Sequence, residues 1–539
     1  MLLFVACDGG SDSAGVAEPR GVIPAADARQ LGTVHFPTSC NQAAHRQMQR
    51  GLALLHHMTY EEARQSFAAA ADADSECGMA YWGMAMTYIH PLWPDVIPEQ
   101  RLRQGWELVS KARATGDKTD RELAYIDAIE AYYADGLERD ESTRLASFAE
   151  AWRQLHESYP DDVEAAAFYS LAHMATAAAS DKSYEKQMLA GRIAEQVLAQ
   201  VPDHPGGHHY VIHAYDSPPL AERALEVARN YGNVAPNVPH ALHMPSHIFT
   251  RLGLWQESIA WNRRAADAAR LPTGEIHLHH HLHALDYLVY AYLQGAQDRK
   301  AEEVLRGMDG LEPPFDPHPA VPYTFAAVPA RLALERQRWQ EAAAIQPRQP
   351  SAVPWNRYPQ IEAISHFARA LGAARNGDPA RAREALQKLG ELHERVAAST
   401  APYDWASQVE IQRLTALAWL TYEEGDTQRA LALMREAADL ESSTEKSPVT
   451  PGEVLPAREL LGDMLRELGR NEEALAEYEV ALDRSPGRFN SLYGAGRAAA
   501  LAGDTGKAAA YYRQLLENCR QTEAQRPRLQ RAKAFLAES

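Results

Sequence analysis

Residues 468–486, LGRNEEALAEYEVALDRSP, decide the fold of this 539-residue chain. They form the central part of a 34-residue unit, 455–488, in which small and aromatic residues occupy fixed places. Places 15, 20, 24, 27 and 32 are held by Gly469, Ala474, Tyr478, Ala481 and Pro486. Small residues allow two helices to pack closely, and the proline ends the second helix. The stretch therefore predicts a helix–turn–helix unit, which must stack on its neighbours to bury its apolar face.

The same spacing recurs in neighbouring units. Gly503 and Ala508 repeat it in the unit that begins at Phe489, and Gly425 and Ala430 repeat it upstream. This pattern resembles the tetratricopeptide repeat (TPR), whose units are helical hairpins. Weaker matches extend over most of the chain, and no strand pattern competes with them. We therefore expect an all-α protein, a TPR-type α-solenoid superhelix of about eight to ten units.

Changes in composition divide the chain into four expected segments. Residues 1–34 indicate a truncated signal and a flexible tether, and 35–310 an N-terminal repeat array with a histidine-rich concave groove. Residues 311–410 are expected to form middle repeats joined by proline-rich loops. Residues 411–539 are expected to form C-terminal repeats and a capping helix.

The composition excludes several classes of protein. The formal net charge is −18, whereas a nucleic-acid-binding protein normally carries a basic stripe. No run of 18 apolar residues occurs, so no membrane-spanning helix is expected. Glycine-rich phosphate loops, nucleophile elbows and C-x-x-C pairs are missing from the sequence. The expected partner is a peptide or protein in the groove, or a small-molecule substrate. The chain is expected to attach to a membrane only through a lipid anchor.

The first residues, MLLFVAC, resemble the end of a bacterial lipoprotein signal, which implies lipidation of Cys7. They lack a basic start and a full apolar core, so a frayed apolar terminus is the alternative. The resemblance implies an anchored protein in the periplasm or on the cell surface. In such an oxidising compartment Cys40 and Cys77 are candidates for a disulfide, although buried free thiols explain them equally well.

Histidines are concentrated in one part of the chain. Residues 204–283 hold 12 of the 22 histidines. His209 and His213 are four residues apart, as are His243 and His247, and the two pairs are separated by 34 residues. Because 34 is the repeat length, the pairs occupy equivalent places, 5 and 9, on successive first helices. Since side chains four apart share a helix face, two such pairs can point four imidazoles into one small volume.

Further candidate ligands continue the same face. They are His240, His283, Asp216, Asp286 and His279. His279 and His283 follow 36 residues after the second pair. An insertion precedes them, so their places within the 34-residue repeat are not fixed by the spacing. In TPR proteins, places 2, 5, 9 and 12 line the concave groove. This resemblance implies that the two histidine pairs and these further candidates, here called the histidine ladder, face a ligand-accessible groove.

The residue types in the ladder point to a transition metal. Imidazole with carboxylate suits zinc, copper or iron, whereas calcium and magnesium prefer oxygen ligands. More candidate ligands are present than one tetrahedral ion needs, so a two-metal site is a further hypothesis. The aspartates either bridge metals or orient imidazoles. Peptide or anion binding by the histidines, and structural packing, are the alternatives.

Five other residues are weaker candidates for the groove, and helix packing or capping is the favoured interpretation for them. They are His173, Tyr210, Tyr287, His56 and His90.

Three strings complete the sequence evidence: HHYVIHAYDSP (208–218), PHALHMPSHIFTRLGLWQES (239–258) and HALDYLVYAYLQ (283–294). They resemble a family of bacterial TPR proteins that are often exported. The resemblance implies the fold and the importance of the ladder histidines, but no reaction. Three functions follow as hypotheses: an extracytoplasmic metal-binding solenoid that binds a small ligand or peptide in its groove, a metal-dependent hydrolase or oxidoreductase, and a metal-free interaction scaffold.

Overall fold

The computed structural model describes residues 30–538, except for 93–96, 179, 272–274, 316–317, 400, 402, 523 and 525. Cys7 and most of the expected tether lie outside the described residues. Within the described ranges the fold consists of helices and connecting segments, with an isolated bridge between Arg270 and Ile276. The expectation of an all-α protein is confirmed.

The helices follow one another as antiparallel hairpins. The first group contains α1 (Gln42–His56), α2 (Tyr60–Ala73), α3 (Gly78–Met86), α4 (Glu99–Ala114), α5 (Asp120–Tyr133), α6 (Glu141–Ser158), α7 (Val163–Met174) and α8 (Glu185–Gln200). The second contains α9 (Pro205–Ala214), α10 (Leu225–Val234), α11 (Pro239–His243), α12 (Pro245–Arg251), α13 (Trp255–Ala268), α14 (Leu278–Gln294) and α15 (Asp298–Met308). The third contains α16 (Ala320–Leu334), α17 (Trp339–Ala344), α18 (Pro359–Arg375), α19 (Pro379–Ala397), α20 (Trp405–Glu423), α21 (Thr427–Ser443), α22 (Ala457–Glu467), α23 (Asn471–Arg484), α24 (Phe489–Leu501), α25 (Thr505–Asn518) and α26 (Pro527–Glu538).

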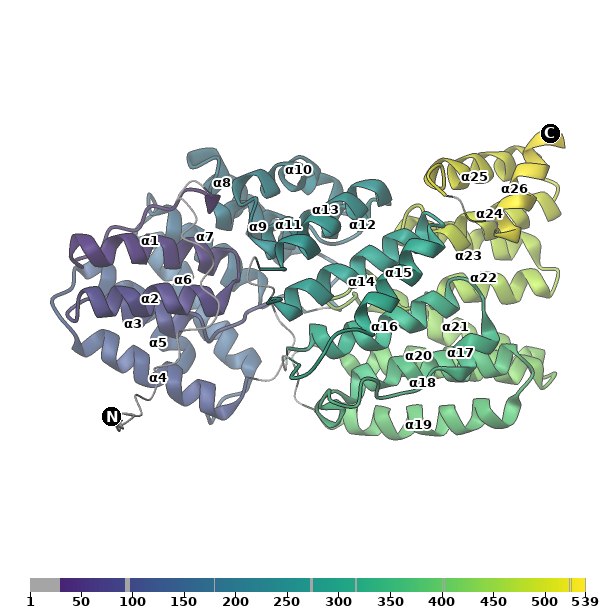
Figure 1. The fold of residues 1–539 in the computed structure, drawn as a ribbon, viewed down its shortest axis with the longest axis horizontal. Coiled ribbons are helices and arrows are strands. Elements are labelled where there is room, and N and C mark those ends of the chain that lie inside the picture. Colours follow the sequence, from purple (N-terminus) through teal and green to yellow (C-terminus); the bar gives the residue numbers. More distant parts are fainter. Residues whose placement is uncertain are drawn as a thin grey trace, which may run out of the picture.

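These three groups form two arms and a bridge. Helices α1–α7 and α16–α21 lie on opposite sides of the molecule, and α9–α14 lie between them (Figure 1). None of the helices in the described ranges is both long and apolar enough to cross a membrane.

The recurring glycine at place 15 has a conformational cause. Gly425, Gly469 and Gly503 follow the first helix of their hairpins and have φ of 93°, 74° and 88°. A residue with a Cβ is strained in this left-handed region, whereas glycine is not. The glycine therefore allows the tight turn that reverses the chain within each hairpin.

The recurring small and aromatic residues have a packing cause. The ring of Tyr478, on α23, lies so close to α22 and α24 that added Cβ atoms on Gly462 and Gly494 would approach it to 2.8 and 2.3 Å. Its hydroxyl donates a hydrogen bond to Asp463 at 2.6 Å. The aromatic residue therefore fills the space that the glycines of the adjacent helices leave open.

A disulfide joins Cys40, just before α1, to Cys77 at the start of α3, with the two Cα atoms 4.8 Å apart. It closes a loop with a sequence separation of 37 residues around the first hairpin. The remaining cysteine in the described ranges, Cys519, is a buried thiol.

Replacing both Cys40 and Cys77 by alanine is expected to lower the free energy of unfolding of the first repeats by about 2–4 kcal/mol. The reason is that the crosslink restricts the unfolded chain. Denaturant unfolding followed by circular dichroism measures the loss. A reductant should shift the unfolding midpoint of the wild type by the same amount and leave the double variant unchanged; equal sensitivity of both proteins would contradict this assignment.

The segment 444–456, between α21 and α22, connects the arms to the bridge. The Lys446 ammonium lies 3.0 Å from the Asp216 carboxylate, just after α9. Further along the segment, the carbonyl of Gly452 accepts a hydrogen bond from Arg331, on α16, at 3.0 Å. The 444–456 segment therefore contacts both the turn after α9 and helix α16.

Candidate metal centre

Four helices position the ladder histidines. Helix α9 carries His209 and His213, α11 carries His240 and His243, α12 carries His247, and α14 carries His283. Helices α9, α11 and α12 each have a proline in the first turn, where the missing backbone N–H costs no hydrogen bond.

The structure brings these six histidines together as two adjacent groups. His209, His213 and His240 form the first trio; His243, His247 and His283 form the second trio. Within each trio, the candidate ligand atoms all lie within 4.8 Å of one another. The trios adjoin, because the rings of His213 and His247 are 5.7 Å apart between centroids. Each trio therefore combines one HxxxH pair with a histidine from another helix.

In the second trio, the Nε2 atoms of two histidines face each other. The hydrogen of each of these rings lies on Nδ1, which donates it to another residue. His243 Nδ1–H donates to Asn262 Oδ1 at 2.8 Å, and Asn262 Nδ2 donates in turn to Ser258. His247 Nδ1–H donates to the Asp216 carboxylate at 2.9 Å. Both Nε2 atoms are therefore free of hydrogen in the neutral rings, yet they lie only 3.1 Å apart.

In the first trio, His209 is oriented in a similar way. His209 Nδ1–H donates to the backbone carbonyl of His56 at 2.6 Å. Among the described residues, no hydrogen-bond partner meets the buried Nε2 atoms of His209 and His213. An unpaired buried ring nitrogen is costly unless another group, such as a metal ion, accepts its lone pair.

Burial keeps these imidazoles neutral. It lowers the pKa of His209 to about 3. Burial, followed by repulsion between neighbouring imidazolium charges, holds the pKa of His213, His240, His243 and His283 well below the ordinary value. Neutral imidazole is the form that binds metals.

The two candidate aspartates occupy different surroundings. Although burial opposes ionisation, Lys446 and Arg251 hold the pKa of Asp216 well below its usual range. Asp216 thus accepts from His247 as an anion and orients that ring. Burial raises the pKa of Asp286 to about 6, and its carboxylate lies 3.3 Å from the Arg331 guanidinium. Neither aspartate belongs to a trio.

His279 lies outside both trios. Its ring contacts those of His280 and His318, with centroids 4.1 and 4.8 Å away. His280 in turn lies 5.7 Å from His240. His279 therefore extends a row of imidazoles that runs from His240 of the first trio through His280.

The TPR resemblance implies that the ladder lines an open groove. The structure differs, because most of the ladder histidines are buried. His209 is fully buried, and His240, His243, His247 and His283 are 2–4% exposed. The covering residues include Lys446 and Thr450 of the 444–456 segment; the Thr450 carbonyl accepts a hydrogen bond from Tyr287 at 2.9 Å. Access remains beside the half-buried His213, which lines a cavity of about 200 Å³ together with Asp216 and Lys446.

A third cluster, His56, Glu164 and His204, has metal-like spacing, but all its ring nitrogens already take part in hydrogen bonds. Glu164 accepts from His56 Nε2 at 2.8 Å and from His204 Nε2 at 3.3 Å. The other ring nitrogens accept from Tyr210 OH at 2.9 Å and from Gly207 N–H at 3.0 Å. Although burial opposes ionisation, the two histidines hold the pKa of Glu164 below its usual range. This cluster is internally satisfied and ties α1, α7 and α9 together.

The remaining candidates contribute to packing around the site. Tyr287 lies against the rings of His243 and His247, with centroids 4.6 and 4.9 Å away. His90 stacks on Tyr60, and His173 contacts Tyr169. Sequence reasoning missed Asn262 and Glu164, because single polar residues on other helices carry no spacing signal.

Comparison with known proteins bears on the fold. A sequence profile of the tetratricopeptide repeat matches residues 415–489 and 459–522. A search of curated proteins found no significant match. Among solved structures, a human IFIT1 dimer with PPP-AAAA is similar at 14% identity, covering 91% of this chain and 98% of that one, with a TM-score of 0.36. The Cut9–Hcn1 hetero-tetramer of the APC/C is similar at 13% identity, covering 89% and 95%, with a TM-score of 0.27.

The stacked helical hairpins and the repeat match within residues 415–522 together identify an all-α solenoid with tetratricopeptide repeats.

Proposed function

We propose that this solenoid binds two transition-metal ions, one in each histidine trio. The observation that carries the proposal is the distance of 3.1 Å between His243 Nε2 and His247 Nε2. In both rings the hydrogen is on Nδ1, which donates to Asn262 in one case and to Asp216 in the other. Two bare lone pairs repel at this distance unless a cation lies between them. An ion with metal–nitrogen distances of about 2.0–2.1 Å holds two imidazole nitrogens roughly 2.9–3.4 Å apart.

The donor set narrows the choice of metal. Each trio offers three imidazoles, and the nearest carboxylate, Asp216, is already occupied by His247, Arg251 and Lys446. Imidazole donors suit zinc, copper or iron, whereas the bridged di-iron sites of helical bundles use glutamates. Zinc and copper are therefore the favoured occupants.

Metal analysis of protein purified with a tag that contains no histidine tests the proposal. The expected content is about two equivalents per chain. After chelation, titration with Zn²⁺ and Cu⁺ should restore it. Protein that neither retains metal nor takes it up after chelation would contradict the proposal.

Asn262→Leu is expected to weaken metal binding at the second trio by about 10–100-fold, because His243 then loses the acceptor that orients its ring. Competition with a chromophoric chelator measures the affinity. Asn230→Leu, on the exposed face of α10, is the control and should leave it unchanged. Equal affinity of wild type and Asn262→Leu would contradict the assigned orientation.

Catalysis at the metal is a second candidate function, favoured by the cavity beside His213. A metal held by His213 lowers the pKa of bound water and polarises a substrate oxygen, and the cavity gives a small substrate access to it. Activity on esters or phenols that appears with added metal and disappears in His213→Ala would support this function. Activity independent of metal would contradict it.

We further propose an extracytoplasmic location. The disulfide between Cys40 and Cys77 supports it, because such crosslinks persist in oxidising compartments. Fractionation of cells that produce the natural gene product tests the location, and recovery in the cytosol with reduced thiols would contradict it. The repeat scaffold also supports protein interaction, on faces other than the one covered by the 444–456 segment.

A further inference from the structure

A second cavity, of about 560 Å³, lies between the two arms, away from the trios. Arg101 reaches it from α4, Tyr323 from α16, and Arg395 from α19. Arg357, at the end of a short 3-10 turn, and Trp405, at the start of α20, also line it. Its volume is typical of sites for small organic molecules.

The charge of the lining is unusual for this protein. Arg101, Arg357 and Arg395 line the cavity together with His90 and His318, and no aspartate or glutamate is among the lining residues that the structure describes. The chain as a whole has a net charge of −18. Within the described ranges, none of these three guanidinium groups forms an ion pair with a carboxylate, whereas Arg348, outside the lining, lies 2.8 Å from Glu362.

Guanidinium groups without carboxylate partners bind oxygen-bearing anions through charge-assisted hydrogen bonds. The three arginines therefore favour an oxygen-bearing anion as the ligand of this cavity.

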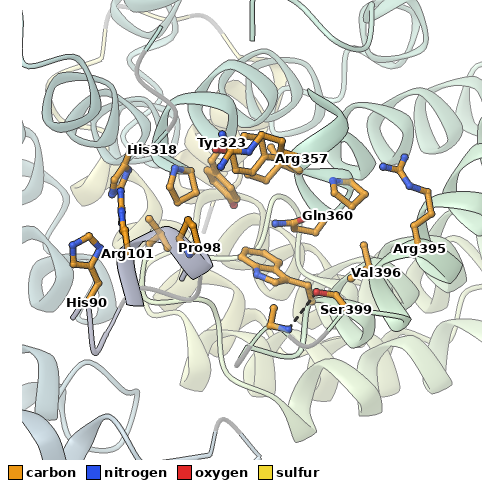
Figure 2. A pocket seen from close by; sticks show the side chains of 17 residues that line it. His90, Pro98, Arg101, His318, Tyr323, Arg357, Gln360, Arg395, Val396 and Ser399 are labelled. Atoms are coloured by element: carbon orange, nitrogen blue, oxygen red, sulfur yellow. Dashed lines mark hydrogen bonds between the residues drawn. The ribbon is translucent and has the colours of Figure 1, made fainter. Parts of the chain in front are cut away.

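The arrangement of the side chains indicates the shape of the ligand. Figure 2 shows Arg101 beside His90 and His318 at one end of the cavity, Arg395 at the opposite end, and Arg357 between them. The rings of Tyr323, Tyr358 and Trp405 also line the cavity. Such a lining suits a flat or apolar body with anionic groups at its ends.

We propose that this cavity binds a small organic polyanion, with carboxylate or phosphate groups held by Arg101, Arg357 and Arg395 around an apolar or aromatic body. The site is independent of the metal proposal, because no residue of either trio lines the cavity.

Calorimetric titration of metal-depleted protein in buffer of low ionic strength tests this. The probes are terephthalate, its uncharged diamide and phenyl phosphate. We expect one equivalent of anion to bind, about tenfold or more tightly than the diamide, and the affinity to fall with added salt. The stronger of the two anions tells carboxylate from phosphate recognition.

Arg357→Gln combined with Arg395→Gln should weaken anion binding by about tenfold or more, and both side chains are exposed enough for the variant to fold. Arg381→Gln, also on α19 but outside the cavity, should bind as the wild type does. Failure of both anions to bind at about 10 mM, equal affinity for the diamide, or unchanged binding in the double variant would each overturn the proposal. A hexaglutamate peptide that binds more tightly than terephthalate would also overturn it, in favour of a peptide site.

Discussion

Arg488→Met is expected to lower the free energy of unfolding by about 3–5 kcal/mol, one of the largest effects of a single substitution in this chain. The guanidinium is fully buried at the start of α24. It lies 3.0 Å from Glu459 on α22 and 2.8 Å from Glu335, just after α16, and it donates to Tyr290 on α14 at 2.8 Å. Methionine retains the volume but leaves two buried carboxylates without their cation.

Denaturant unfolding of the full chain measures this loss. Arg470→Met is the matched control, because Arg470 forms a comparable pair with Glu473 at 2.6 Å while remaining 41% exposed, and such surface pairs contribute about 0–1 kcal/mol. Adding Glu335→Gln and Glu459→Gln to Arg488→Met should recover part of the stability, since neutral amides cost less to bury than unpaired carboxylates. A loss no larger than that of the control would contradict the assigned role.

His243→Ala is expected to abolish metal binding at the second trio and to reduce the bound metal from about two equivalents to one. The loss of affinity should exceed the roughly 10–100-fold caused by removing an orienting partner, because a ligand atom itself is missing. Metal analysis after dialysis, and competition with a chelator, measure both quantities.

The matched control for His243→Ala is His281→Ala. His281 is also buried, on α14, but its Nδ1 donates to the carbonyl of Ala266, and it belongs to neither trio. Both substitutions remove a buried imidazole, so general destabilisation affects them alike. Retention of two equivalents by His243→Ala, or an equal loss in His281→Ala, would contradict the metal proposal.

Much of the fold was predictable because repeats leave local signals. Gly469 and Gly503 mark turns with positive φ, and Tyr478 marks the space between two glycines on adjacent helices. Each of these features depends on residues within about one repeat. The 34-residue spacing of the HxxxH pairs is of the same kind, and the structure brings both pairs into neighbouring trios.

The features of the fold and of the site that the sequence did not predict depend on contacts between distant parts of the chain. Lys446 reaches Asp216 across 230 residues, so the covering of the groove by the 444–456 segment has no local signature. The trios likewise combine side chains from separate helices, α9 with α11 in one and α11, α12 and α14 in the other. Asp286, on α14, meets Arg331 on α16 rather than the imidazoles.

Anomalous diffraction from crystals of protein loaded with zinc or copper, recorded on both sides of the metal absorption edge, tests the central claim most directly. We predict two peaks, one bounded by His209, His213 and His240 and the other by His243, His247 and His283. Crystals of a fully loaded protein with no peak at either trio, or with peaks only at surface histidines, would contradict it.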